Sequence, residues 1–256
     1  HFTGLILNPL DANSYIPKLR QGFEGDWVFR LPYTTEPQAG APVYLFYLFL
    51  GHVGRWLGAR SIVVYHVARL LGGVALWGTL YALARFVSTD LKERRAMFLL
   101  TALGAGLGWL AALLGYQSAD MWIAEAFPVY AVLANAHFPL SMALMMGVAL
   151  CGLHLLRGTG RAWPWGVGAL IMAVLLGVIQ PFGLVPVLGG LGVMLVTHAL
   201  RQRKIPWQAA GWLALAGLAA MPYPLYMLSA LQADPVLAAW NAQNVTPSPP
   251  LWDWLL

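Results

Sequence analysis

Charged side chains are scarce in this chain. Of its 256 residues only 10% are charged, whereas 59% are hydrophobic. Soluble domains carry about 25% charged residues, so the composition excludes an ordinary soluble protein, and its apolar content excludes a disordered one. The single cysteine, Cys151, excludes a disulfide scaffold and any cysteine-rich metal site. An integral membrane protein is the class that fits.

Several common functional motifs are also missing. The sequence contains no P-loop, no dinucleotide-binding glycine fingerprint, no H-E-x-x-H zinc motif and no G-x-S-x-G elbow. Its formal net charge is +5, but the basic residues cluster at the ends of apolar runs. That placement favours membrane topology over a nucleic-acid footprint. We therefore expect the lipid bilayer, and no nucleic acid, as a partner.

Six apolar runs are long enough, or nearly so, to cross a bilayer, which takes roughly 20 residues of helix. They recur through the chain, so none is a cleaved signal peptide. The sequence predicts an all-α, polytopic helical bundle with spans at about 62–86, 96–115, 138–156, 163–180, 183–199 and 207–231.

Basic residues fix the expected orientation, because short cytoplasmic loops retain Lys and Arg. Nine of the fifteen Lys and Arg residues lie in three short segments between apolar runs: Arg85, Lys92, Arg94 and Arg95; Arg157 and Arg161; Arg201, Arg203 and Lys204. These loops are predicted to lie inside. The apolar run 42–58 conflicts with that count if it spans, so we interpret it as an amphipathic helix in the outer interface.

Three regions follow from this topology. Residues 1–61 form an extracytoplasmic loop with the interfacial helix, 62–231 form the bundle, and 232–256 begin a further extracytoplasmic segment. Because the chain starts at His1 and stops shortly after an aromatic cluster at 252–254, we expect it to be a segment of a longer protein.

Carboxylates are absent from every expected span, and none occurs from residue 126 to residue 233. Ion-coupled transporters place ionisable groups within the membrane, so that class is disfavoured. Eight of the ten acidic residues are expected outside: Asp11, Glu24, Asp26, Glu36, Asp120, Glu125, Asp234 and Asp253. They indicate either an external acidic site or merely the retention of basic residues inside.

The first ninety residues contain a recurring order of elements. Asp11 is followed by Tyr15, then Gly25-Asp26-Trp27, then Pro42 with Tyr44, and then an Arg-, Leu- and Gly-rich span from 69 to 85. In this order the sequence resembles the GT-C superfamily of polytopic glycosyltransferases, in particular bacterial members similar to protein O-mannosyltransferases and lipid A aminoarabinose transferases. It departs from the family at Ala12, where a second acidic residue is common.

The resemblance implies a glycosyltransferase that moves a sugar, with inversion, from a polyprenyl-phosphate donor to an acceptor. It implies an active site on the outer face of a bacterial cytoplasmic membrane and assigns Asp11 as the general base. The alternative for Asp11 is a turn or helix-cap residue, since Asn8-Pro9-Leu10-Asp11 is typical of a turn. The rival functions are a transporter or lipid flippase, or a non-catalytic membrane assembly subunit.

Five further residues are candidates for binding substrate. Lys18 and Arg30 are cations in the Asp11 loop that suit a leaving phosphate, and the resemblance adds Tyr15. A short apolar segment between Glu125 and His137 is expected to be re-entrant or to lie at the surface, and to carry Asn135 and His137 toward the site. His137 has an alternative structural interpretation.

A divalent metal is possible but not established by the sequence. Asp120, Glu125 and His137 offer oxygen and nitrogen donors that suit such an ion, although their spacing matches no motif. The identity of the sugar and of the acceptor and the oligomeric state do not follow from the sequence.

Overall fold

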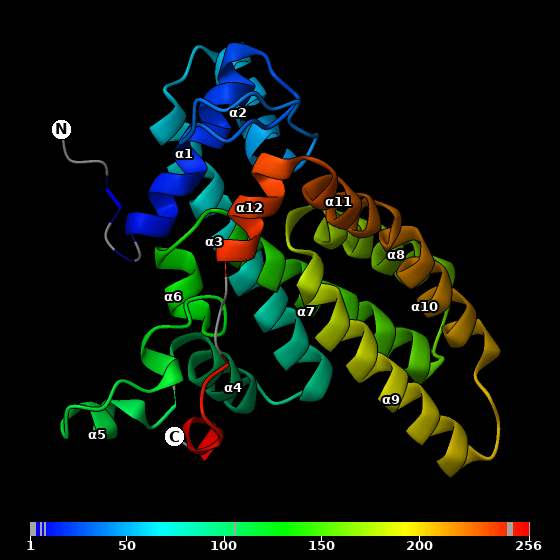
Figure 1. Ribbon diagram of the computed structural model, residues 1–256. Helices are drawn as coiled ribbons and strands as arrows, with labels where there is room; N and C mark the ends of the chain where they lie inside the picture. Colours follow the sequence, from blue (N-terminus) through cyan, green and yellow to red (C-terminus); the bar gives the residue numbers. More distant parts are fainter. Residues whose placement is uncertain (1–3, 6, 8, 105, 245–247, 256) are drawn as a thin grey trace.

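The computed structural model describes residues 4, 5, 7, 9–104, 106–244 and 248–255 (Figure 1). Within them the regular elements are all helices, and the only strand-like pairing is an isolated bridge between Phe29 and Ala41. The expected all-α class is confirmed. Five helical segments are long and apolar enough to cross a membrane: Ser61–Val87, Leu91–Ala112, His137–Arg157, Pro181–Gln202 and Trp207–Ala233. The chain is therefore described as an integral membrane protein.

The apolar helices form a bundle. It comprises α3 (Ser61–Val87), α7 (His137–Arg157), α8 (Trp163–Ile179), α9 (Leu184–Gln202), α10 (Trp207–Ala220) and α11 (Pro222–Ala233). The helix α8, with 17 residues, is apolar but shorter than the five segments that are long enough to cross a membrane. The 3-10 turn η2 (Pro181–Gly183) joins α8 to α9. α10 and α11 together fill the run expected at 207–231, with a break at Met221 where Pro222 starts a new helix.

The run expected at 96–115 is not one continuous helix. It divides into α4 (Leu91–Leu103) and α5 (Gly108–Ala112). Glycine is a poor helix former, and the sequence between these helices is glycine-rich. The backbone N–H of Gly108 donates to the Asp120 carboxylate (2.9 Å) instead of to a helical carbonyl. The expected run therefore consists of two helices, although Leu91–Ala112 as a whole is long and apolar enough to cross a membrane.

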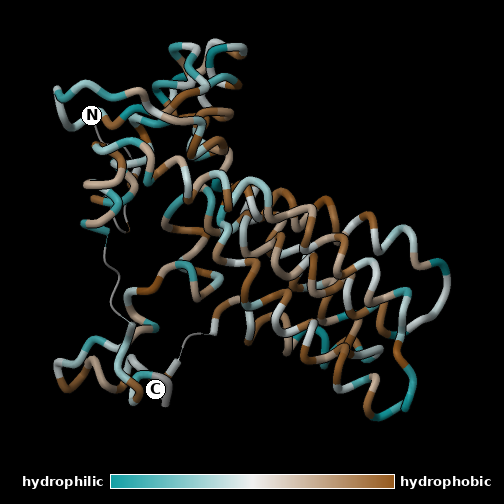
Figure 2. Tube along the Cα trace, turned by 45° about the vertical axis from the view of Figure 1, so that its right-hand side comes forward, coloured by the Kyte–Doolittle hydropathy of each residue, from teal (hydrophilic) through white to brown (hydrophobic). Residues whose placement is uncertain are grey.

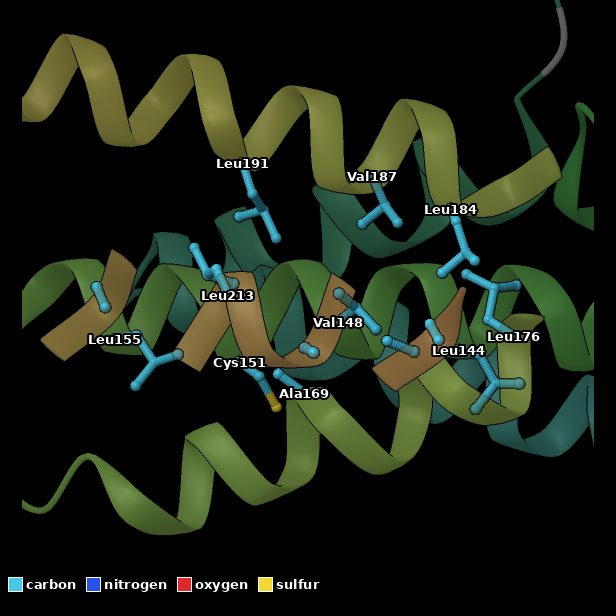
Figure 3. Close-up of a cluster of buried hydrophobic side chains, with 14 of the residues drawn as sticks. Leu144, Val148, Cys151, Leu155, Ala169, Leu176, Leu184, Val187, Leu191 and Leu213 are labelled. Atoms are coloured by element: carbon cyan, nitrogen blue, oxygen red, sulfur yellow. The ribbon is translucent and has the colours of Figure 1, made fainter. Parts of the chain in front are cut away.

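The largest apolar core joins α7, α8, α9 and α10 (Figure 3). Its members include Val148 and Cys151 on α7, Ala169 on α8 and Leu191 on α9, all 5% exposed or less. Small residues allow close helix approach, as is usual in membranes. A Cβ added at Gly166 would lie 2.0 Å from the Trp212 ring.

The three basic loops meet at one end of the bundle. Arg157 donates to the Phe86 carbonyl (3.2 Å), which joins the ends of α7 and α3. Arg157 and Arg201 line one cavity between α7 and α9. Hydrophilic residues mark the loops that end the apolar helices there (Figure 2). The starts of α3 and α7 lie at the opposite end.

A helical cap covers that opposite end. It consists of α1 (Pro9–Glu24) and α2 (Leu45–Leu57), which pack closely together (Figure 1). α2 agrees with the apolar helix expected at 42–58, whereas the first forty residues, which contain α1, were expected to form a loop. α1 was missed because it contains Pro17 and its mean hydropathy is low.

Four shorter elements complete the fold. α12 (Pro235–Gln243) lies beside the cap, and α6 (Pro128–Leu133) packs on α3 and α7. η1 (Ala119–Met121) and η3 (Leu251–Leu255) lie away from the cap, near α4 and α5 (Figure 1), where Asp253 accepts a hydrogen bond from the Ala119 N–H (3.0 Å). Asp234 accepts hydrogen bonds from Val236 at the start of α12 and from Ala39 and Gly40 in the loop before α2. This carboxylate joins the C-terminal part to the N-terminal cap and is structural.

Candidate functional site

A cavity of about 500 Å³ lies under α1, at the end of the bundle opposite the basic loops. Four residues singled out from the sequence line it: Asp11, Tyr15, Glu125 and His137. The other described lining residues are Trp122, Ile123, Phe138, Phe182, Ser248 and Pro249. The structure therefore brings together side chains from α1, the segment before α6, and the start of α7.

Asp11 lies in the first turn of α1, inside the helix and not before it. Its carboxylate accepts a hydrogen bond from the Asn135 side-chain amide. The other end of that amide, Oδ1, accepts from the Tyr65 hydroxyl on α3 (2.9 Å). The carboxylate is thus held by a different element of the fold, which a residue serving only to cap its own helix does not require.

Asn135 is itself firmly placed. It is fully buried, and it follows α6, whose final carbonyl at Leu133 accepts a hydrogen bond from Arg69 (2.8 Å). A buried amide with both ends bonded has little rotational freedom. The segment brings Asn135 to Asp11, but it is buried against α3 and α7 and does not lie at the surface.

The environment of Asp11 shifts its acidity. Burial raises the pKa of the Asp11 carboxyl, because an apolar setting disfavours the charged form. The hydrogen bond from Asn135, the positive charge of Lys18 and a hydrogen bond from Tyr15 oppose that rise. A carboxylate with a raised pKa is a stronger proton acceptor, which is what a general base needs.

Three rings stand beside Asp11. Tyr15 stacks on Tyr47, with ring centroids 4.5 Å apart, and the Tyr47 hydroxyl lies 2.7 Å from Nδ1 of His137. Burial raises the pKa of Tyr15 and of Tyr47, so both stay neutral. Tyr47 therefore orients the His137 ring at the cavity wall. His137 is thus both a buried, hydrogen-bonded residue of the fold and a lining residue of the cavity.

Lys18 does not line the cavity. Its side chain is buried, at 2% exposure, and its ammonium lies 4.4 Å from the ring centroids of both Tyr15 and Tyr44. The rings of Phe29 and Trp240 follow at 5.6 Å. The ammonium also donates to the Ser14 carbonyl (3.1 Å). This group is enclosed in an aromatic box and is not presented to a phosphate.

The charge of Lys18 still reaches the site. Burial lowers the pKa of Lys18 to about 8, and the opposing attraction comes from Asp11, two helical turns away on α1. Cation–π contacts with four rings stabilise the charged form further. Lys18 therefore acts on Asp11 through the field of its ammonium.

Arg30 lies outside the site as well. It is exposed, and its backbone N–H and carbonyl are both bonded to the Gln21 side chain (3.0 and 2.7 Å). It is not among the described residues of the cavity wall. Glu125, by contrast, is exposed at the wall, and its charge contributes to the raised pKa of Tyr15.

The three residues considered for a metal are not gathered. Asp120 is buried and engaged by the Gly108 N–H and the Ser118 hydroxyl. Across the described ranges no group of three His, Cys, Asp or Glu side chains is arranged to hold an ion. Glu125 and His137 alone share the cavity.

Two residues that support the site were missed from the sequence. Tyr47 and Tyr65 lie on apolar helices, where a tyrosine is an ordinary core or interface residue. Only their three-dimensional neighbours, His137 and Asn135, give their hydroxyls a role.

No protein-family model, curated protein or solved structure matches this chain. The interpretation of the cavity therefore depends on its geometry and chemistry.

Proposed function

We propose that this chain is part of a membrane glycosyltransferase, which moves a sugar from a polyprenyl-phosphate donor to an acceptor at the outer membrane face. Asp11 is the general base of this proposal. The observation that carries it is the cavity at one end of an apolar bundle, in which a partly buried carboxylate is oriented by Asn135 beside Tyr15, Glu125 and His137.

The chemistry needs a base because an acceptor hydroxyl or amine is a weak nucleophile while it keeps its proton. In the proposed step the Asp11 carboxylate takes that proton as the acceptor atom attacks C1 of the sugar. The bond from C1 to the phosphate oxygen breaks, its electron pair leaves with the polyprenyl phosphate, and the configuration at C1 inverts.

A lipid-linked donor suits the surroundings of the cavity. Phe182 lines both the cavity and an apolar groove of about 620 Å³ formed by η2, α9 and α11. A head group in the cavity and a hydrocarbon chain in the groove would meet at this residue. The polar groups of the described wall that face a phosphate are Tyr15, His137 and Ser248, while Lys18 contributes charge from its aromatic box.

Sugar transfer by the full-length protein in liposomes tests this proposal. The assay supplies defined polyprenyl-phosphate sugars and measures the released polyprenyl phosphate. Asp11→Asn is expected to reduce the rate by about 10²–10⁴-fold, the usual contribution of general-base catalysis. Asp26→Asn is the matched control, because Asp26 is an exposed carboxylate in the same cap that is absent from the described cavity wall. An undiminished rate of transfer by Asp11→Asn would show that Asp11 is not the general base.

A further inference from the structure

A second cavity lies at the other end of the bundle, among the basic loops. Its volume is about 500 Å³, and three helices form it: α3 through Phe86, α7 through Leu156 and Arg157, and α9 through six residues. The α9 residues are Val193, Met194, Thr197, His198, Arg201 and Gln202. It is separate from the Asp11 cavity and has no part in the proposed transfer.

The α9 wall becomes more polar toward the end of the helix. Its residues form two rows spaced by four, so they occupy one face. Val193 and Met194 come first, Thr197 and His198 follow one turn later, and Arg201 and Gln202 end the face. An apolar stretch, a weakly polar stretch and a cationic end match the acyl chains, ester region and phosphate of a membrane lipid.

Arg157 faces α9 from the end of α7. Its guanidinium carbon lies 3.8 Å from the centroid of the Phe86 ring, and one of its N–H groups donates to the Phe86 carbonyl (3.2 Å). A guanidinium has five N–H donors in a rigid fork, so this anchoring leaves others for a ligand. Arginine is suited to two-pronged binding of phosphate.

No carboxylate occurs among the described residues of this wall. The two acidic residues of the neighbouring loop are used locally. Asp90 accepts from the N–H groups of Lys92 and Glu93 at the start of α4 (2.8 and 2.9 Å), and Glu93 accepts from the Ser88 hydroxyl. Among the described residues of the wall, no carboxylate therefore pairs with Arg157 or Arg201.

We propose that this cavity binds an acidic phospholipid, with the phosphate between Arg157 and Arg201 and an acyl chain along Val193 and Met194. Basic pockets between membrane helices are known to hold anionic head groups. The lipid would fill the gap between α7 and α9 at the membrane end where the basic loops gather.

Native mass spectrometry of the full-length protein, purified in detergent, tests the proposal. Phosphatidylglycerol is the probe, and zwitterionic phosphatidylcholine is the reference lipid. We expect preferential retention of phosphatidylglycerol. The double variant Arg157→Gln with Arg201→Gln is expected to weaken its binding about 25-fold, or about fivefold for each arginine, since each cation near a membrane surface contributes about 1 kcal/mol.

The matched control is Arg203→Gln with Lys204→Gln, which removes the same amount of charge directly after α9 but leaves the described cavity wall intact. Neither residue is among the described residues of the cavity wall, so neither is expected to contact the phosphate, and affinity is expected to stay within about twofold. An equal loss in both double variants would show diffuse attraction and overturn the site.

Two further arms decide the remaining outcomes. Inorganic phosphate in large excess should leave the lipid bound. Complete displacement of the lipid by phosphate would show that the cavity binds free phosphate and would overturn the lipid proposal. Should the first double variant not fold, Arg201→Gln alone keeps the contact of Arg157 with Phe86 and still predicts the fivefold loss. Unchanged phosphatidylglycerol affinity in that variant, or equal retention of the two lipids by wild type, contradicts the proposal.

Discussion

At the residue scale, the acidity of one carboxylate connects the fold to the proposed chemistry. Asp11 is subject to burial, which raises its pKa, and to Asn135, Lys18 and Tyr15, which lower it. Its effect on a pH–rate profile has a definite sign. A base acts only when ionised, so activity is lost as pH falls through the folded-state pKa of Asp11, which lies above the ordinary value.

Lys18→Met tests the contribution of the enclosed ammonium. Because the charge of Lys18 lowers the pKa of Asp11, its removal raises that pKa, and the acidic limb of the pH–rate profile of sugar transfer moves to higher pH. Lys18→Arg keeps a charge and should restore the limb. Arg20→Met is the control, since Arg20 is an exposed residue of the same helix paired with Glu24. An acidic limb that stays in place in Lys18→Met would refute this coupling.

Asn135→Ala tests the support of the carboxylate from the other side. It leaves Asp11 and Tyr65 without their shared partner, and an unmatched buried polar group costs about 1–3 kcal/mol of stability. Denaturant titration in mixed micelles measures this loss. An unchanged free energy of unfolding would show that the hydrogen-bonded chain is not maintained in the membrane-embedded protein.

At the element scale, the contact between α1 and α2 positions Asp11. The two backbones meet at Gly22 and Gly51, where an added Cβ would lie 2.0 Å from the Leu48 carbonyl oxygen and 2.1 Å from the Leu19 carbonyl oxygen, respectively. Only glycine permits this approach. The pairing brings Tyr47 of α2 under Tyr15 of α1.

Gly51→Ala is expected to reduce the free energy of unfolding by about 1–3 kcal/mol, the usual effect of overpacking a close contact. Gly78→Ala on α3 provides the comparison. A Cβ at Gly78 meets nothing within 4 Å, so alanine there should be neutral or stabilise by up to about 1 kcal/mol through helix propensity. Equal destabilisation by both substitutions would contradict the glycine-mediated contact.

The sequence predicted those helices whose apolar composition is enough to identify them. The long apolar helices follow from membrane energetics, because a spanning segment must be apolar and helical. It did not predict α1, whose helix depends on packing against α2, or the break between α4 and α5, where Asp120 bonds to Gly108. Local pattern carries no information about such tertiary contacts.

The candidate site divides in the same way. Asp11, Tyr15, Glu125 and His137 were selected from the sequence and share one cavity. Lys18 was selected for the positive charge in its loop, but the four rings around it come from α1, the loop between α1 and α2, and α12. A box assembled from three separate segments cannot be recognised from the spacing of any one of them.

At the scale of the whole molecule, the two ends of the bundle differ in chemistry. One end carries the Asp11 cavity and the helical cap; the other carries the basic loops and the arginine-lined cavity. Both proposals depend on these ends facing opposite membrane surfaces, with the basic end in the cytoplasm as basic loops favour.

Cysteine labelling from each side of the membrane tests this claim most directly. Cys151 is the single cysteine and is buried, so Cys151→Ser gives a background without a native thiol. On it, Asn13→Cys marks the exposed surface of α1 and Thr159→Cys the exposed loop after α7. A membrane-impermeant maleimide applied to intact cells should label position 13 and leave position 159 unlabelled until the membrane is opened. Labelling of both positions, or of position 159 alone, from outside would contradict the account.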